Sequence, residues 1–252
     1  MIGNFALSDA VREKAAGHAY FVRATYSREA GRLVQHLATI GVQRVAVAHL
    51  DNPGGVEVQT LVKAAAQQHG GVGVVASAPV KHDGANAPEA GKLLAAASPQ
   101  AVLMFLAGPP VAKLMAAMQE GGANPSFYGM SVVAGDQVAK ELGPRLRGLA
   151  TSQVVPYPWA EADSTARHFR DRCAKAQVPV AYHTYEGYLN ALVLLDGLRR
   201  CGRNPNREGL HEAMRGLKTR IAGVDIDYSG GQHTGSRFVE LVHVTESGRF
   251  LR

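Results

Sequence analysis

The sequence predicts an α/β protein built on a doubly wound parallel sheet. Short apolar runs alternate with amphipathic helical segments between residues 27 and 122, and only short connections join them. Repeated βα units of this kind give parallel strands with helices on both faces. With 252 residues and 46% apolar content, the chain is long enough for one large domain or two smaller ones.

The first predicted helix follows Ser27, a residue type that caps helix N-termini, and ends at Gly41. A strand is expected over 45–50, a helix over 58–65 and a strand over 72–76. Residues 101–106 are apolar at every position, as in a parallel strand covered on both faces. A further helical stripe over 111–118 ends at Gly121 and Gly122.

From residue 164 the pattern changes, because three helices are predicted in succession over 164–176, 183–200 and 206–217. The C-terminal part indicates a hairpin of residues 224–228 and 237–244 around a turn at 229–231. A second turn is expected at 246–248. A parallel block, a helical block and an antiparallel pair suggest two lobes that share crossovers.

Composition argues against several classes of protein. The net charge of +6 arises from 27 basic and 21 acidic residues that are interspersed, so no nucleic-acid partner is expected. No apolar run reaches the length of a membrane span, and the N-terminus has no secretory signal, so the chain as given is expected in the cytoplasm. Cys173 and Cys201 are interpreted as unpaired thiols, one on an apolar helix face and one at a helix end.

No motif supports catalysis, a metal or a cofactor. The glycines at 70–73 precede a strand and are interpreted as a helix stop. The loop 51–55 follows a strand and opens a helix, which fits either a ligand site or a plain tight turn. Ser131 lacks the surroundings of a nucleophile elbow, which leaves a capping role or a ligand contact, and none of the ten histidines forms a metal-binding motif.

Several segments together resemble the periplasmic ligand-binding proteins of branched-chain amino acid type, the type I two-lobed substrate-binding subunits of ABC transporters. The resembling segments are 21–26, 44–55, 127–131, 153–158, 185–188 and 233–241. The resemblance lies in their order and spacing along nearly the whole chain. It implies a Venus-flytrap protein that closes on a small amino-acid-like or carboxylate ligand, without chemistry.

The resemblance also implies that the first lobe is incomplete. Family members begin with a signal peptide and about four further βα units of ~30 residues each, so a truncated gene or a fragment is expected. Residues 24–153 and 224–252 would then form the second lobe, and residues 1–23 and 154–223 a remnant of the first. Members of the family are periplasmic.

The resemblance assigns candidate ligand-binding residues one by one. Ser8 lies near the place of a threonine that anchors the ligand in relatives. Gly54 and Ala107 stand where relatives often carry an aromatic side chain. Ser131 stands where relatives place a polar or acidic group for the ligand ammonium, with Tyr128 nearby. Because these are the polar groups that remain at the site, binding is expected to be weak.

The expected function is therefore ligand binding for an ABC permease. Two alternatives stay open: a cytoplasmic ligand-sensing regulator of the same fold, and an α/β enzyme that binds a nucleotide or acyl substrate at 51–55. An incomplete lobe should also leave apolar side chains of the later helices exposed and promote self-association. The side chains expected to be exposed are Phe169, Leu189, Leu192 and Leu195.

Overall fold

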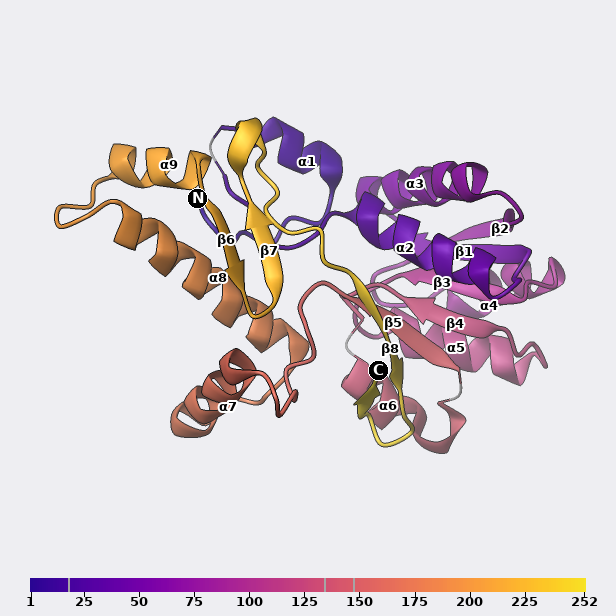
Figure 1. Ribbon diagram of the computed structural model, residues 1–252. Helices are drawn as coiled ribbons and strands as arrows, with labels where there is room; N and C mark the ends of the chain where they lie inside the picture. The colour runs from indigo at the N-terminus through magenta and orange to yellow at the C-terminus, as the bar shows by residue number, and fades with distance from the viewer. Residues whose placement is uncertain (18, 134, 147) are drawn as a thin grey trace. The chain divides into compact units, whose positions relative to one another are not determined.

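The computed structural model describes residues 1–17, 19–133, 135–146 and 148–252. Within these ranges the chain forms two compact units, each built from two segments (Figure 1). Unit 1 comprises Met1–Thr25 and Val154–Glu240, and unit 2 comprises Tyr26–Gln153 and Leu241–Arg252. The chain therefore passes from one unit to the other after residues 25, 153 and 240.

Unit 2 is an α/β sandwich whose strands and helices alternate. Its elements in chain order are α2 (Tyr26–Thr39), β1 (Arg44–Leu50), α3 (Pro53–His69), β2 (Gly73–Val80), α4 (Ala87–Ala96), β3 (Ala101–Phe105), α5 (Pro110–Glu120), β4 (Ser126–Gly129), α6 (Gly135–Leu142), a 3-10 turn (Gly143–Arg145), β5 (Leu149–Gln153), β8 (Glu240–Val244) and β9 (Phe250–Leu251).

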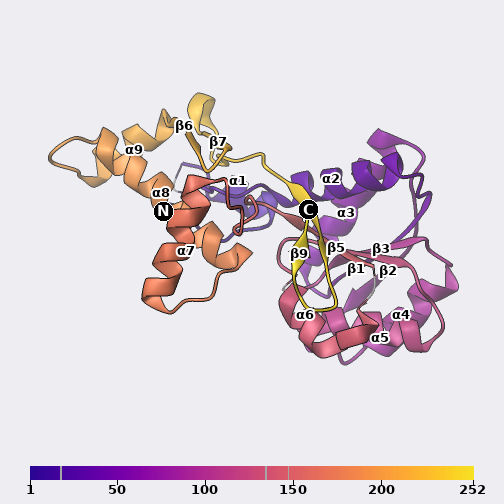
Figure 2. The same cartoon turned by 60° about the horizontal axis from the view of Figure 1, so that its bottom comes forward.

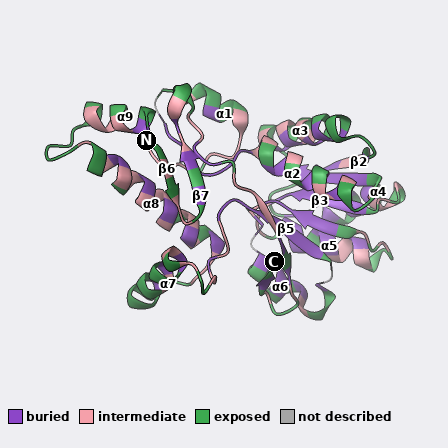
Figure 3. Ribbon diagram, viewed as in Figure 1, coloured by how far each residue is buried: buried purple, intermediate pink, exposed green. Residues whose placement is uncertain are grey.

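Within the described residues, the strand order of this sheet is β2-β1-β3-β4-β5-β8-β9, and the pairs that β1 to β5 form with one another are parallel. Helices α2 and α3 cover one face, and α4, α5 and α6 cover the other (Figure 2). All five residues of β3 are buried, and the buried positions of unit 2 concentrate in its strands (Figure 3). The predicted doubly wound parallel sheet is confirmed.

Helix α2 shows how the apolar pattern becomes packing. Leu33, Val34 and Leu37 are completely buried against the sheet, and each contributes about 1.5–3 kcal/mol of hydrophobic stabilisation. The helix begins at Tyr26, so Ser27 lies in its first turn, and its predicted role as N-cap was wrong. The spacing of apolar residues defines the buried face of a helix but not its first residue.

Unit 1 is mainly helical. Its elements are α1 (Asp9–Lys14), α7 (Ser164–Ala176), α8 (Tyr182–Arg200), α9 (Arg207–Arg215), β6 (Lys218–Ile221), β7 (Val224–Asp227) and a 3-10 turn (Ser229–Gly231). Residues 164–217 are all described, and no strand separates α7, α8 and α9, as predicted. Their core includes Val193, Met214 and Tyr228, together with Tyr20 and Val22 of the N-terminal segment.

The predicted C-terminal hairpin was wrong in its pairing. Strand β7 pairs antiparallel with β6, and β8 pairs with β9 around the second predicted turn. Beside the 237–244 stretch, β7 forms the isolated antiparallel bridge Ile226–Ser236. The β6–β7 turn uses positive φ angles at both Ala222 and Gly223, the geometry that two-residue hairpins require, although alanine is an uncommon residue there.

This pairing also changes how the chain divides. Sequence analysis grouped residues 224–240 with residues 24–153, but they pack within unit 1. The hydrogen bonds that join β7 to β6 hold the segment there, together with those from the backbone of Gly235 and Ser236 to Phe21 and Val22.

The expected exposure of four apolar side chains is only partly found. Phe169 and Leu189 are 2% and 3% exposed, Leu192 is half-buried, and Leu195 is 46% exposed. The Phe169 ring on α7 packs against Tyr185 and Tyr188 of α8, with ring centroids 4.7 and 5.4 Å apart. Contacts between α7 and α8 thus cover the Phe169 side chain, which we expected to be exposed because the first lobe is incomplete.

Candidate functional site

The carboxyl-end edge of the sheet in unit 2 has the topology of a ligand site. The helix that follows β1 lies on one face and the helix that follows β3 lies on the other, although β1 and β3 are neighbours (Figure 2). The loops after these two strands therefore leave the sheet in opposite directions. Open α/β sheets bind their ligands at this switch point.

The loop after β1 contains the predicted site residue Gly54. The side chain of Asn52 accepts a hydrogen bond from the Gly55 N–H at 2.9 Å and caps α3, whose first residue is Pro53. A Cβ atom on Gly55 would lie 2.0 Å from the Leu50 carbonyl oxygen, whereas one on Gly54 would meet only the Asn52 side chain at 3.4 Å. Gly55 thus allows α3 to approach β1, while Gly54 has room for a side chain.

The loop after β3 contains the predicted site residue Ala107. Leu106 before it is completely buried, and Ala107 itself is half-buried. Gly108 then takes a positive φ of 74°. The structure therefore places Gly54 and Ala107 on the two sides of the switch point, and neither offers a polar side chain.

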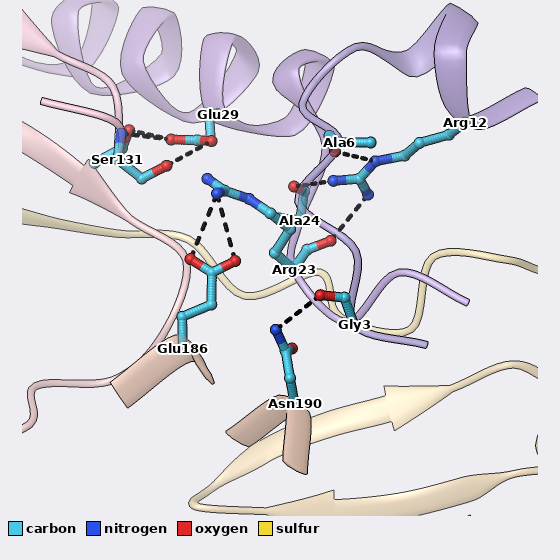
Figure 4. Close-up of polar contacts among 10 residues, drawn as sticks. Gly3, Ala6, Arg12, Arg23, Ala24, Glu29, Ser131, Glu186 and Asn190 are labelled. Atoms are coloured by element: carbon cyan, nitrogen blue, oxygen red, sulfur yellow. Dashed lines mark hydrogen bonds and ion pairs between the residues drawn. The ribbon is translucent and has the colours of Figure 1, made fainter. Parts of the chain in front are cut away.

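Ser131, two residues beyond the end of β4, is held by a buried carboxylate on α2 (Figure 4). Its backbone N–H donates to Glu29 Oε2 at 2.9 Å, and its hydroxyl donates to Glu29 Oε1 at 3.0 Å. The hydroxyl of Ser152, on the neighbouring strand β5, donates to Glu29 Oε2 at 2.6 Å. Glu29 is completely buried, whereas Ser131 is half-buried.

Sequence analysis missed both Glu29 and Ser152. Glu29 lies next to Ala30 and four residues before Leu33, so it falls on the apolar face of its helix, which is the available signal. Ser152 belongs to the polar run Thr151–Gln153 within a strand whose five residues are all buried. Buried polar groups of this kind need hydrogen-bond partners, and Glu29 and Ser152 supply one another.

The structure does not bring Tyr128 to the same place as Ser131. Tyr128 is 6% exposed, and its ring lies in the core beneath α2. Its hydroxyl lies 3.5 Å from Nε2 of His36, seven residues beyond Glu29 or about 10 Å along the helix. Burial raises the pKa of Tyr128, and burial together with the Arg32 and His243 charges lowers the pKa of His36.

Ser8, in unit 1, has a structural task. Its hydroxyl oxygen accepts the N–H of Val11 at 3.2 Å and caps α1. In the same helix the buried guanidinium of Arg12 donates to the carbonyl oxygens of Ala6, Arg23 and Ala24 at 2.8–3.0 Å (Figure 4). This network holds the N-terminal segment of unit 1 in shape.

A second polar pair in unit 1 joins Arg23 to Glu186 of α8. One guanidinium nitrogen lies 3.4 Å from each carboxylate oxygen, and the two side chains are 2% and 12% exposed (Figure 4). The Phe5 ring stacks on the guanidinium at 4.5 Å, a cation–π contact. The Glu186 carboxylate compensates the charge of Arg23, which allows the guanidinium to occupy a buried position.

Unit 1 also contains an aromatic cluster that sequence analysis did not single out. The rings of Tyr157 and Tyr182 lie 5.2 and 5.7 Å from the ring of Trp159. Tyr182 is buried, whereas Tyr157 and Trp159 are half-buried. Trp159 is the single tryptophan of the sequence, so its fluorescence reports on this cluster alone.

Other features of the described residues do not add a site. No group of three or more His, Cys, Asp or Glu side chains in the described part of the chain is placed to hold a metal ion. A pocket of about 450 Å³ beside β7 is lined by Asp225, Gln232 and Arg237 among others, and it contains none of the predicted site residues. Cys173 is buried on α7 and Cys201 lies at the end of α8; both are free thiols.

The family of the chain follows from its sequence as a whole. Residues 2–249 match the model of the family described as periplasmic binding protein. The chain belongs to this family. The resemblance carried by the six dispersed segments is therefore confirmed, and the family is one of ligand-binding proteins.

Solved structures share the fold over nearly the whole chain. An extracellular ligand-binding receptor from Verminephrobacter eiseniae is 23% identical with a TM-score of 0.88, and the match covers 100% of this chain and 72% of that one. A possible leucine/isoleucine/valine-binding protein from Rhodopirellula baltica is 21% identical (TM-score 0.83, covering 99% and 70%).

A branched chain amino acid ABC transporter from Thermus thermophilus with bound valine is 19% identical, with a TM-score of 0.79 and coverage of 92% and 65%. At these identities the likeness shows the fold, which is the type I fold expected from the sequence. No curated protein matches the chain. In the described ranges, every helix is too short or too polar to cross a membrane.

Proposed function

We propose that this chain is the substrate-binding component of an ABC-type transporter for amino acids or related small carboxylates and amides, and that it acts in the periplasm. Membership of the periplasmic binding protein family supports the proposal. So do the two neighbours described as a leucine/isoleucine/valine-binding protein and as a branched chain amino acid ABC transporter with bound valine. The expected partner is an ABC permease.

The observation that carries the proposal is the position of Ser131. It follows β4 at the carboxyl-end edge of a doubly wound sheet, where ligands of such folds bind. Its half-buried hydroxyl is oriented by a buried carboxylate, as a binding group must be if it is to keep one geometry. In this proposal unit 2 is the second ligand-binding lobe, and unit 1 belongs to the first.

The proposed binding is weak and involves no reaction of the ligand. Gly54 and Ala107, on either side of the switch point, have no aromatic or hydrogen-bonding side chain to offer a ligand. Ser8 is occupied as the cap of α1, and Tyr128 packs in the core. A single hydrogen bond to a charged ligand group then supplies only about 1.5–3 kcal/mol.

Differential scanning fluorimetry against a panel of amino acids and small carboxylates tests the proposal. A ligand that binds only the folded chain must raise the unfolding midpoint, and calorimetry then gives its affinity. Ser131→Ala should weaken that affinity about tenfold or more, since one charge-assisted hydrogen bond is lost. Ser247→Ala, which removes an exposed hydroxyl in the β8–β9 turn, is the matched control.

The result that would contradict the proposal is a panel in which no compound raises the midpoint. Tight, sub-micromolar binding that Ser131→Ala leaves unchanged would instead show that the ligand binds elsewhere.

A further inference from the structure

Four arginines gather where α8 ends and α9 begins. Arg199 and Arg200 are the last two residues of α8. Arg203 lies in the connecting loop, and Arg207 is the first residue of α9. The loop projects beyond the two helices (Figure 1), and every residue from 202 to 208 is exposed. Residues 199–207 therefore form a basic surface of unit 1, which we call the arginine loop.

The packing of α8 against α9 fixes these two helix ends beside each other. A Cβ atom on Gly197, near the end of α8, would lie 2.7 Å from Met214 Sδ and 3.3 Å from Leu210 Cδ1 of α9. Asn206 caps α9, since its side-chain oxygen accepts the Gly209 N–H at 2.7 Å. The arginines at the two helix ends thus extend from fixed backbone positions.

Most of the positive charge of the arginine loop is not neutralised within the described part of the chain. Arg200 forms an ion pair with Asp196 at 3.3 Å. The side chains of Arg199, Arg203 and Arg207 are exposed and form no ion pair or hydrogen bond with the residues that the structure describes. Three guanidinium groups therefore face solvent without a partner from their own unit.

Helix stability explains two of these arginines but not the other two. The helix dipole stabilises cations near a C-terminal end, which accounts for Arg199 and Arg200. At a helix N-terminus the dipole has the opposite sign, so the first position of α9 disfavours Arg207 and favours an acid such as Glu208. Arg203 belongs to neither helix. Residues that break a local rule without a stabilising return are expected at functional surfaces.

The composition of the arginine loop fits an anionic surface better than a folded protein. The centre of a protein interface is built from aromatic or large aliphatic side chains, and residues 199–208 contain none. Guanidinium groups match the geometry of phosphate oxygens with two parallel hydrogen bonds. Phospholipid headgroups offer such phosphates over a broad surface that attracts basic clusters and requires no matching shape.

We infer that the arginine loop docks unit 1 onto a membrane surface that contains anionic phospholipids. The inference goes beyond the proposed function, because the contact requires neither ligand nor permease. It takes from that proposal only the location in the periplasm, which favours lipid over nucleic acid as the polyanion. The contact keeps the chain beside the membrane in which the proposed permease lies.

The test measures co-sedimentation of the full chain with vesicles of phosphatidylcholine alone and of phosphatidylcholine mixed with an equal part of phosphatidylglycerol. The wild-type chain should bind only the anionic vesicles, and about 1 M salt, which shortens the Debye length to about 3 Å, should abolish the binding. The triple variant Arg199→Gln, Arg203→Gln and Arg207→Gln should lower the partition coefficient about thirtyfold or more, because each arginine near an anionic surface contributes about fivefold.

The matched control removes the same charge from exposed positions that are not clustered. Lys63→Gln, Lys92→Gln and Lys140→Gln lie on α3, α4 and α6 of unit 2 and also lower the net charge of +6 by three. This variant should change the partition coefficient by less than about threefold.

Circular dichroism and a thermal melt first establish that both triple variants fold. If the arginine variant does not fold, the single substitution Arg203→Glu decides. It reverses one charge in the exposed loop and should lower the partition coefficient about tenfold or more.

Every other outcome overturns the inference. Equal binding to both kinds of vesicle, no binding to the anionic vesicles, or an equal loss in the lysine control removes the docking role of the arginine loop. Tighter binding to a double-stranded DNA oligonucleotide than to the anionic vesicles rules out lipid as its partner. These results leave the ligand-binding proposal standing, because the fluorimetry panel contains no vesicles, and a panel without a ligand likewise leaves the vesicle result unchanged.

Discussion

The hydroxyl of Tyr228 donates a hydrogen bond to the backbone carbonyl oxygen of Phe21, 3.1 Å away and 207 residues earlier in the chain. Both residues are completely or almost completely buried, and the Tyr228 ring packs edge-on against Tyr20 at 5.2 Å. The Phe21 carbonyl also accepts the N–H of Gly235. This contact joins the N-terminal segment of unit 1 to the end of its β6–β7 hairpin.

Tyr228→Phe should therefore lower the free energy of unfolding, whereas Tyr185→Phe should not. Tyr228 loses a made hydrogen bond, which should cost about 1 kcal/mol. Tyr185 is also completely buried, but its hydroxyl has no hydrogen-bond partner in the described part of the chain, so its removal should be neutral or stabilising. Urea titration of both variants measures the two effects, and equal destabilisation would contradict this assignment.

The same two tyrosines predict a loss of stability in alkali. Burial raises the pKa of both Tyr185 and Tyr228 above the ordinary value of 10.0. The folded chain then keeps protons that the unfolded chain releases, so this stabilisation is complete below pH 10 and falls as the pH rises above 10. The free energy of unfolding, measured between about pH 8 and 11, should decline less steeply in Tyr185→Phe than in wild type. Identical slopes would rule out this contribution.

Arg12 should be among the residues on which the folding of unit 1 depends most. Its guanidinium is 4% exposed and donates to three backbone carbonyls and to the hydroxyl of Thr234. Arg12→Ala leaves these acceptors without their donors and should cost more than about 3 kcal/mol.

Arg12→Lys should rescue little, because an ammonium cannot reproduce the planar fork. The control for the Arg12 variants is Arg215→Ala, which breaks an exposed pair with Glu212 and should cost less than about 1 kcal/mol. Chemical denaturation gives all three values, and a mild effect of Arg12→Ala would show that water replaces the guanidinium.

Two adjacent glycines at the switch point should respond differently to alanine. Gly55→Ala forces a Cβ to within 2.0 Å of the Leu50 carbonyl and should cost about 2 kcal/mol or more, because α3 must move off β1. Gly54→Ala has room and gains helix propensity, so it should be neutral or slightly stabilising. Thermal melts of the two variants compare them directly, and similar midpoints would contradict the close packing at Gly55.

The local spacing of apolar residues was sufficient to predict most of the helices and strands. The helix over 164–176 agrees with α7 residue for residue, and the wholly apolar run at 101–106 corresponds to a strand in which every residue is buried. The spacing of apolar residues carries this information because each helix or strand must bury one face or both. The order of dispersed segments likewise indicated the family, since no single one of them had to be specific.

Pairing and polar organisation were decided only in the tertiary structure. Strand β7 pairs with β6 and not with the 237–244 stretch. A turn at Ala222 and Gly223, which the sequence analysis did not predict, sets this register. Glu29 meets Ser131 and Ser152 across 102 and 123 residues. No periodicity relates positions so far apart. The sequence determines which face of α2 is buried, and only the assembled sheet determines which two hydroxyls donate to the Glu29 carboxylate.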